Sequence, residues 1–186
     1  VDDLKEEKYL VLVTKFFDMK FKYKLLSKFD NLDEDIDGVL INSENFGALN
    51  LLQHRYKEQV KTIYIDPPYN TGNDGFLYND TYQHSSWMSF IYDRLYLSKE
   101  LMRDDGVIFS SIDDNEVANF DYLCDSVFFR KNFIRKIVWQ KRTAPDMRTT
   151  FSDAQEYILL YGKTNKAPLT FNKLLLTEEQ KGRYKN

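Results

Sequence analysis

One stretch of the chain decides its fold class: Val60-Lys61-Thr62-Ile63-Tyr64-Ile65-Asp66-Pro67-Pro68-Tyr69. Its first six residues form a largely apolar run and predict a buried strand. Neither proline can stay inside a central strand, because each lacks the N–H that a sheet ladder needs, so the strand must end at about Asp66. The acid, the prolines and the tyrosine therefore stand in a stiff loop at the carboxyl end of a strand, where open α/β sheets bind their ligands.

This loop suits methyl transfer to the exocyclic amine of a nucleobase. The nitrogen of such an amine is a poor nucleophile, because its lone pair is delocalised into the ring. If the Asp66 carboxylate and the Pro67 carbonyl each accept one N–H, the nitrogen is drawn toward sp³ geometry, while Tyr69 stacks on the base. The same four residues, Pro68 included, also make an ordinary strand-ending turn. The loop alone leaves both interpretations open.

The segments before the loop predict a βαβ unit. Val39–Ile41 reads as a short strand, and residues 42–45 lead into an apolar spacing typical of a helix face, made by Phe46, Leu49, Leu51 and Leu52. The strand that ends at Asp66 would complete the unit.

The segments after the loop continue the alternation. Ser85 or Ser86 is expected to cap a helix with the apolar residues Trp87, Phe90, Ile91, Leu95, Leu101 and Met102. Residues 104–106 predict a turn and Val107–Phe109 the next strand. Asp113 or Asp114 is expected to cap a second helix, whose apolar face carries Val117, Phe120, Cys124, Val127 and Phe128.

The last two predicted strands are Ile134–Trp139 and Glu156–Tyr161, joined by a polar loop over 140–153 and expected to form a β-hairpin at a sheet edge. Alternation of strands and helices indicates a doubly wound α/β fold with a largely parallel sheet.

Several motifs in a fixed order carry a family resemblance. They are Tyr64-Ile65-Asp66-Pro67-Pro68-Tyr69-Asn70-Thr71-Gly72, Tyr78-Asn79-Asp80, His84-Ser85-Ser86-Trp87, Asp105-Gly106-Val107-Ile108-Phe109, Ile112-Asp113-Asp114-Asn115-Glu116, Ile137-Val138-Trp139 and Glu156-Tyr157-Ile158-Leu159. From about Val39 to Lys163 the chain resembles the modification subunit of type III restriction-modification systems. These subunits are β-class DNA adenine-N6 methyltransferases. An ordered series is far more specific than one motif.

The resemblance implies a fold of the S-adenosylmethionine-dependent methyltransferase type, incomplete in this chain. It implies S-adenosylmethionine as cofactor, with Glu44 and Asn45 as candidates for contact with its adenosine. It also implies double-stranded DNA with a flipped adenine as substrate, a homodimer for the full-length protein, and a restriction subunit as a partner that the sequence leaves open. Where the family often has histidine, the chain has Gln155, so no role of that imidazole is carried over.

The glycine-rich turn that holds the cofactor's methionine end in this family has no match among the seven glycines. In β-class enzymes that motif follows the target-recognition region, so the chain resembles the amino-terminal part of a longer protein and is expected to be inactive alone. We expect an accessory segment over 1–37, a partial catalytic domain over 38–165, and over 166–186 the start of the segment leading to target recognition.

Charge is unevenly distributed. The net charge is −3, but seven basic residues and one acid lie between Arg130 and Arg148. Lys141, Arg142 and Arg148 are therefore candidates for contact with DNA phosphates. The alternative is a solvated edge strand whose basic residues prevent pairing with another chain.

Two alternative functions remain open beside adenine-N6 methylation: a non-catalytic DNA-binding fragment and a cytosine-N4 methyltransferase. The acid at Asp66 favours adenine.

Other candidate sites are weak. Asp113, Asp114 and Glu116 form an acidic cluster that helix capping explains better than a metal, so no metal site is expected. His54 and His84 are interpreted as structural or surface residues, and Cys124 as a core thiol. No apolar run reaches membrane-spanning length, and the amino end has no signal-peptide pattern, which predicts a cytoplasmic protein.

Overall fold

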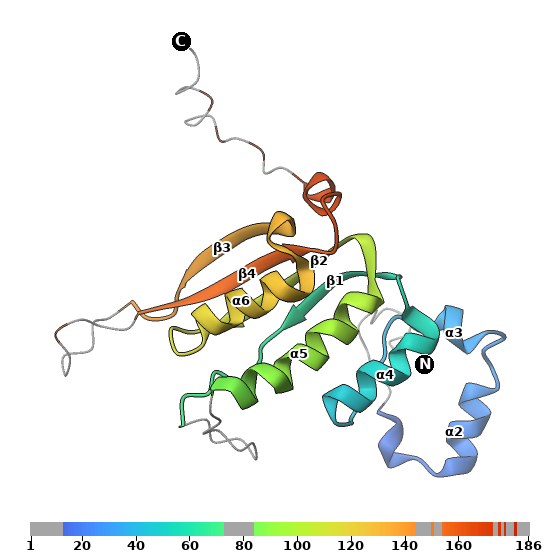
Figure 1. Cartoon of the computed structure of the whole chain (residues 1–186). Coiled ribbons are helices and arrows are strands. Elements are labelled where there is room, and N and C mark those ends of the chain that lie inside the picture. The colour runs from blue at the N-terminus through green and yellow to red at the C-terminus, as the bar shows by residue number, and fades with distance from the viewer. Residues whose placement is uncertain are drawn as a thin grey trace. The chain divides into compact units, whose positions relative to one another are not determined.

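The computed structural model describes residues 13–72, 84–143, 150, 154–172, 175, 177 and 181. The chain divides into two compact units, Val1–Asn42 and Ser43–Asn186. The first unit contains a 3-10 turn, η1 (Thr14–Phe16), and the helices α2 (Met19–Leu26) and α3 (Leu32–Asp35) (Figure 1). Helix α2 begins after Asp18, whose carboxylate accepts a hydrogen bond from the backbone N–H of Phe21 at 2.7 Å.

The predicted strand at Val39–Ile41 is wrong. These residues have an irregular backbone, and the side chain of Leu40 is 99% exposed. A strand needs a neighbouring strand to pair its backbone groups, and no described strand pairs with this segment. Helix α4 (Asn45–Tyr56) forms as expected, but an irregular segment precedes it, so the predicted βαβ unit is not present.

Four described strands form one sheet in the order β1-β2-β4-β3 (Figure 1). Their bounds are β1 (Val60–Ile65), β2 (Met102–Ile112), β3 (Phe133–Gln140) and β4 (Gln155–Gly162). The α/β class is confirmed, and so is the hairpin of β3 and β4 at the sheet edge. Of the three neighbouring pairs only β1–β2 is parallel. Strand β4 runs antiparallel to β2 and to β3, and the hairpin of β3 and β4 lacks the crossover helix that parallel neighbours need.

Helices α5 (His84–Leu101) and α6 (Val117–Phe128) cover one face of the sheet (Figure 1). Their buried side chains join those of β2 and β4 in one core, whose largest members are Trp87, Phe120, Phe128 and Tyr161. The rings of Trp87 and Phe120 meet edge to face with centroids 6.0 Å apart. The short turns η2 (Arg130–Asn132) and η3 (Ala167–Thr170) complete the described elements.

The apolar face of α6 is as predicted, but the amino-terminal caps of α5 and α6 are not. The predicted face of α6 is confirmed, and the thiol of Cys124 lies in the core, where burial raises its pKa well above the ordinary value. The predicted caps are wrong. Helix α5 begins at His84, so Ser85 and Ser86 lie inside its first turn. Helix α6 begins after Glu116, so Asp113 lies too early in the chain to cap it, and its carboxylate accepts the backbone N–H of Asn115 in the preceding turn, at 3.0 Å.

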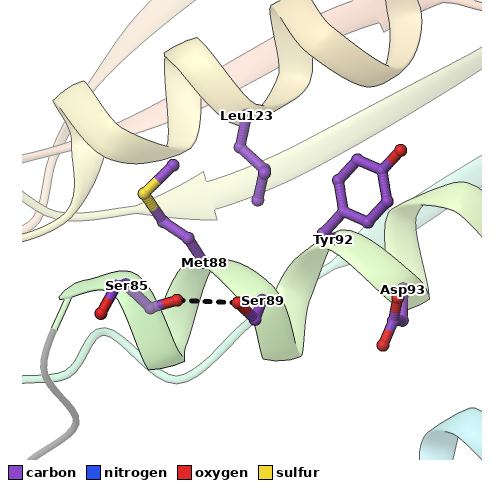
Figure 2. A pocket seen from close by; sticks show the side chains of 6 residues that line it. All are labelled: Ser85, Met88, Ser89, Tyr92, Asp93 and Leu123. Atoms are coloured by element: carbon purple, nitrogen blue, oxygen red, sulfur yellow. Dashed lines mark hydrogen bonds between the residues drawn. The ribbon is translucent and has the colours of Figure 1, made fainter.

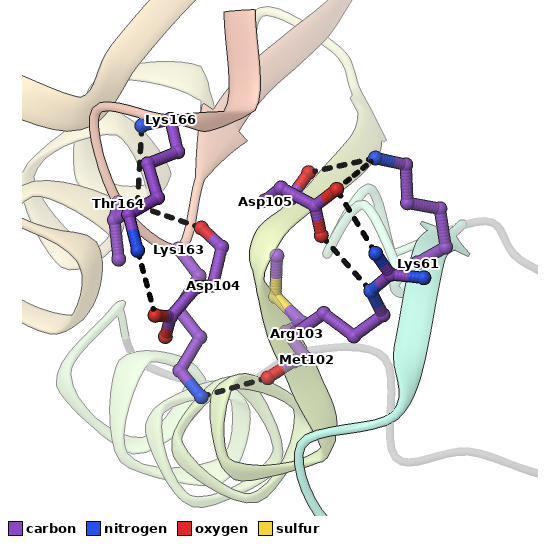
Figure 3. A network of polar contacts seen from close by, with 8 residues as sticks. All are labelled: Lys61, Met102, Arg103, Asp104, Asp105, Lys163, Thr164 and Lys166. Carbon is purple, nitrogen blue, oxygen red and sulfur yellow. Dashed lines mark hydrogen bonds and ion pairs between the residues drawn. The ribbon is translucent and has the colours of Figure 1, made fainter. Parts of the chain in front are cut away.

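The predicted turn at 104–106 is a bulge within β2. Val60 pairs with Met102, but Thr62 already pairs with Val107, so the intervening residues of β2 loop out. The ammonium group of Lys61 lies 2.7 Å from the Asp105 carboxylate and holds the bulge from β1, as Figure 3 shows. A Cβ atom on Gly106 would lie 2.9 Å from the Arg103 carbonyl oxygen, so the bulge requires glycine there.

Within the described ranges, no helix combines the length and the apolar character needed to cross a bilayer.

Candidate active site

Strand β1 brings Asp66 to the same edge of the sheet as the carboxyl end of β2. Ile65 pairs with Ser110, and the hydroxyl groups of Tyr64 and Ser111 are 2.5 Å apart across the two strands. Beyond that pair the chain leaves the sheet, because two prolines follow Asp66. Asp66 is exposed and Pro67 is buried. The carboxylate therefore faces solvent at the edge where parallel strands bind ligands.

The loop Asp66–Tyr69 is anchored by helix α5. The indole N–H of Trp87, a fully buried side chain, donates a hydrogen bond to the Pro68 carbonyl oxygen at 2.8 Å. Among the described residues no hydrogen bond is made to the Pro67 carbonyl. The two successive carbonyl groups therefore differ: the Pro68 carbonyl is held by the core, whereas the Pro67 carbonyl has no hydrogen bond from the described residues.

The ring of Tyr69 is partly buried and packs against the core cluster. Burial raises the pKa of its hydroxyl group far above the ordinary value, and the neighbouring Asp66 carboxylate raises it further. A tyrosine is neutral at physiological pH even with its ordinary pKa, about 10, so the Tyr69 ring carries no charge. A neutral ring next to an exposed carboxylate offers a stacking surface and a hydrogen-bond acceptor side by side.

Glu116, at the turn between β2 and α6, contacts the residue that follows the loop and was not among the site residues predicted from the sequence. Its side chain is fully buried, yet its carboxylate lies 2.7 Å from the Asn70 side-chain amide and 2.8 Å from Nδ1 of His84. Asn70 immediately follows Tyr69. The sequence contains one indication of this cluster: Asn70 and Glu116 each follow a predicted strand, and His84 precedes a predicted helix.

Glu44 and Asn45 lie at the start of helix α4. The Glu44 carboxylate accepts the backbone N–H of Gly47 at 3.1 Å and pairs with the guanidinium group of Arg94 on α5. The hydrogen bond from Arg94 is the main cause that lowers the pKa of Glu44. Glu44 thus fixes the amino end of α4 against α5, and its side chain is still 62% exposed.

Two of the predicted DNA-binding residues, Lys141 and Arg142, follow directly after the end of β3. Lys141 pairs with Glu156, Arg142 is exposed, and Arg148 lies outside the described residues. Other members of the basic run are also paired with acids: Arg130 and Lys136 lie 3.3 Å and 3.1 Å from the Asp121 carboxylate of α6. These acids belong to α6 and β4, so they do not appear in the charge of the segment from Arg130 to Arg148.

Gln155 is the first residue of β4. Its side-chain amide lies 3.4 Å from the Asp114 carboxylate, which also accepts a hydrogen bond from the Tyr157 hydroxyl at 2.8 Å. The residue is thus part of a polar contact between β4 and the turn after β2.

A hollow between α5 and α6 is a poorer candidate for chemistry. It has a volume of about 480 Å³ and is lined by Ser85, Met88, Ser89, Tyr92, Asp93 and Leu123. Figure 2 shows that the Ser89 hydroxyl is bound to the backbone of its own helix, at Ser85. Nor do the described residues contain any group of three or more His, Cys, Asp and Glu side chains that could hold a metal ion.

The fold and the loop at its sheet edge agree with a comparison against protein families. A family described as DNA methylase matches residues 60–186, and the chain belongs to this family. The match begins at the first residue of β1 and includes the whole sheet and the loop Asp66–Tyr69.

Individual relatives place the chain more narrowly within the family. It is 37% identical over 158 residues to the Mod subunit of the type III restriction-modification enzyme EcoP15I of Escherichia coli, covering 69% of this chain and 24% of that subunit. To the EcoPI Mod subunit of Escherichia phage P1 it is 38% identical over 163 residues, covering 70% and 25%. The resemblance to type III modification subunits is confirmed, and the chain spans about a quarter of their length.

A solved structure of M1.HpyAVI in complex with SAM supports the fold. Its TM-score is 0.50 at 18% identity, covering 74% of this chain and 60% of the other.

Proposed function

We propose that this chain supplies the amine-binding half of a type III DNA adenine-N6 methyltransferase. The observation that carries the proposal is the loop Asp66–Tyr69, which stands at the carboxyl end of β1 with an exposed acid, a partly buried ring and a carbonyl group held by Trp87. Membership of the DNA methylase family supports the same reaction class. The proposed location of this activity is the cytoplasm, together with the cellular DNA.

The proposed role of the loop is to make the adenine amine nucleophilic. The Asp66 carboxylate accepts one N–H of the amine and the Pro67 carbonyl accepts the other, so the nitrogen lone pair is released from the ring and directed outward. Pro68 keeps the backbone stiff between them and the ring. The Tyr69 ring stacks on the flipped adenine.

S-adenosylmethionine is the proposed cofactor, and when bound it supplies an electrophilic methyl group. Glu44 and Asn45 are the proposed contacts to its adenosine. Glu44 fits this role in part, since its exposed carboxylate can accept hydrogen bonds, but it is already engaged with Gly47 and Arg94. We therefore expect weak cofactor binding by residues 1–186 alone and no turnover. Calorimetric titration tests this, and micromolar affinity would contradict it.

The proposed substrate is double-stranded DNA, and the proposed partners of the full-length protein are a second copy and a restriction subunit. Adenine is favoured over cytosine because Asp66 provides a charged acceptor for the amine. Cytosine-N4 enzymes usually have a similar loop with serine in the position of this aspartate. The alternative of a non-catalytic DNA-binding fragment applies only to this part of the protein.

Replacing Asp66 tests the proposed function in the full-length protein. Asp66→Ala should lower methylation by at least about a hundredfold, the usual cost of removing one preorganised hydrogen-bonding group. DNA affinity should be retained, since it comes mostly from phosphate contacts. Asp66→Asn is the matched control of similar shape and should also be impaired, because it removes the negative charge that strengthens the hydrogen bond to the amine. Chromatography of digested DNA should find N6-methyladenine and no N4-methylcytosine. Full activity of Asp66→Ala would refute the assignment.

A further inference from the structure

Glu116 is the most deeply buried carboxylate among the described residues, with a side chain that is 0% exposed. A buried acid is costly unless its oxygen atoms receive hydrogen bonds. Here they do. Oε1 accepts the Asn70 amide at 2.7 Å and lies 2.8 Å from His84 Nδ1, and Oε2 accepts the Asn119 amide at 2.8 Å.

These partners come from three different segments. Asn70 belongs to the loop after β1, His84 to the first turn of α5, and Asn119 to the first turn of α6. Glu116 itself stands between β2 and α6. One carboxylate thus connects the end of the loop Asp66–Tyr69 to both helices that cover the sheet.

The backbone at Asn70 shows why this connection matters for the loop. Its φ is 59°, in the left-handed region that non-glycine residues rarely adopt, although Asn tolerates it better than most. Such a conformation persists where surrounding contacts hold it. The hydrogen bond from the Asn70 side chain to Glu116 is one of those contacts.

A second anchor lies on the other side of Tyr69. The Pro68 carbonyl is held by the Trp87 indole at 2.8 Å, and the Trp87 ring packs against Phe120 of α6. Tyr69 is thus flanked by one bond at Pro68 and one at Asn70. Both bonds end on the packed unit of α5, α6 and the turn after β2.

We propose that Glu116 is a positioning residue for methyl transfer: through Asn70 it holds Tyr69 and Asp66 in the geometry that receives the flipped adenine. This inference rests on the proposed function of the loop. Glu116 is itself fully buried and acts through Asn70. Its loss should therefore slow turnover much more than it weakens DNA binding.

A purely structural role would predict a different pattern, and the chain offers variants that separate the two. Asn70→Gly removes the side-chain bond but tolerates the left-handed backbone. Asn119→Ala removes one bond to Glu116 without touching the loop. Glu116→Gln keeps an acceptor for Asn70, whereas Glu116→Ala removes it. If Glu116 positions the loop, the methylation rate of each variant should depend on whether the bond between Asn70 and residue 116 is kept. If its role is only structural, the rate should follow the stability of each variant.

The rate measurement uses the full-length protein under single-turnover conditions with saturating DNA and cofactor. Asn70→Gly and Glu116→Ala should lose about tenfold to a hundredfold in rate, as expected when a reacting group is displaced by about 1 Å. Asn119→Ala and Glu116→Gln should stay close to wild type. Equal losses for Asn70→Gly and Asn119→Ala, in step with their melting temperatures, would overturn the proposal.

Hydrogen exchange of the peptide covering residues 66–72 tests the anchor without any activity. Asn70→Gly should raise exchange in this peptide and leave β2 and α6 protected, whereas Asn119→Ala should not raise it. Unchanged exchange in Asn70→Gly would overturn the positioning role even if the protein methylates DNA. If wild type itself does not methylate DNA, the proposed function fails, and the exchange result still decides whether the Asn70 side chain, bound to Glu116, holds the loop.

Discussion

The ammonium group of Lys141 lies 3.5 Å from the carboxylate of Glu156 on the neighbouring strand β4. Lys141 also donates its backbone N–H to the Ala154 carbonyl at 2.8 Å, so it continues the β3–β4 ladder past the end of β3. A cation that already has an acidic partner contributes less to DNA binding than one without, because the acid repels the same phosphates. The net positive charge around residues 130–148 is therefore smaller in the folded chain than the sequence of this segment suggests.

The DNA-binding prediction concerns Lys141, Arg142 and Arg148. If they bind phosphates, replacing all three by Ala should flatten the plot of log affinity against log salt, for every DNA sequence alike. The slope should change by roughly 0.9 for each phosphate that is no longer neutralised. The matched control is Glu156→Gln, which removes the acidic partner of Lys141 and should strengthen binding at low salt. Fluorescence anisotropy of the full-length protein at several salt concentrations measures both.

The alternative role of this basic stretch gives the opposite result. Strand β3 is an edge strand of the described sheet, and basic residues protect such edges from pairing with another chain. In that case the slope should not change, and the triple variant should self-associate in sedimentation. An unchanged slope would count decisively against DNA contact.

Tyr69 is expected to act through its ring. Tyr69→Ala should weaken the hold on the extruded base by about 1–3 kcal/mol, the usual value of a stacking contact. Tyr69→Phe keeps the ring and should stay close to wild type in base flipping. A fluorescent adenine analogue at the target position reports flipping in the full-length protein. Wild-type fluorescence and turnover in Tyr69→Ala would show that the ring does not stack on the base.

Asp121 should contribute stability that depends on pH. Burial opposes ionisation, but hydrogen bonds from Tyr161 and Lys136 outweigh it and lower the pKa of Asp121. Because the pKa in the folded state is below the ordinary value of about 3.9, the contribution is present above that pH and is lost as pH falls through the folded pKa.

The corresponding variants are Asp121→Asn and Tyr161→Phe. The Tyr161 hydroxyl lies 2.8 Å from Asp121 Oδ1 and 2.7 Å from Asp125 Oδ1, so its removal should cost about 1–2 kcal/mol at neutral pH. Urea denaturation of the chain at several pH values should show the deficit of Asp121→Asn shrinking below about pH 4. A deficit that is constant with pH would contradict the ionic origin.

Gly106 should not tolerate a side chain. A Cβ atom would lie 2.9 Å from the Arg103 carbonyl oxygen and 3.0 Å from that of Val60, and both are backbone atoms that cannot move alone. Gly106→Ala should therefore destabilise the chain by about 1–3 kcal/mol. Gly47→Ala, in α4, meets only the Ser43 hydroxyl at 3.8 Å and should be neutral or stabilising by about 1 kcal/mol. Equal melting temperatures for both variants would refute the bulge argument.

Local patterns in the sequence predicted most elements of the second unit. The apolar spacing of α5 and α6 and the prolines after β1 act over a few residues, so they could be read directly. The loop Asp66–Tyr69 was located in the same way. The failures at Val39–Ile41 and at the bulge before Gly106 share one cause: strand pairing depends on a partner that is distant in sequence.

The sequence by itself determined the α/β class, the place of Asp66 at a strand end and the family resemblance, because each depends on neighbouring residues. Only the tertiary structure decided what holds that loop and what neutralises the basic run. Asn70 and Glu116 are 46 residues apart and meet through a 2.7 Å hydrogen bond. Such a bond forms only when β1, β2 and the helices beside them have packed, so no local pattern records it.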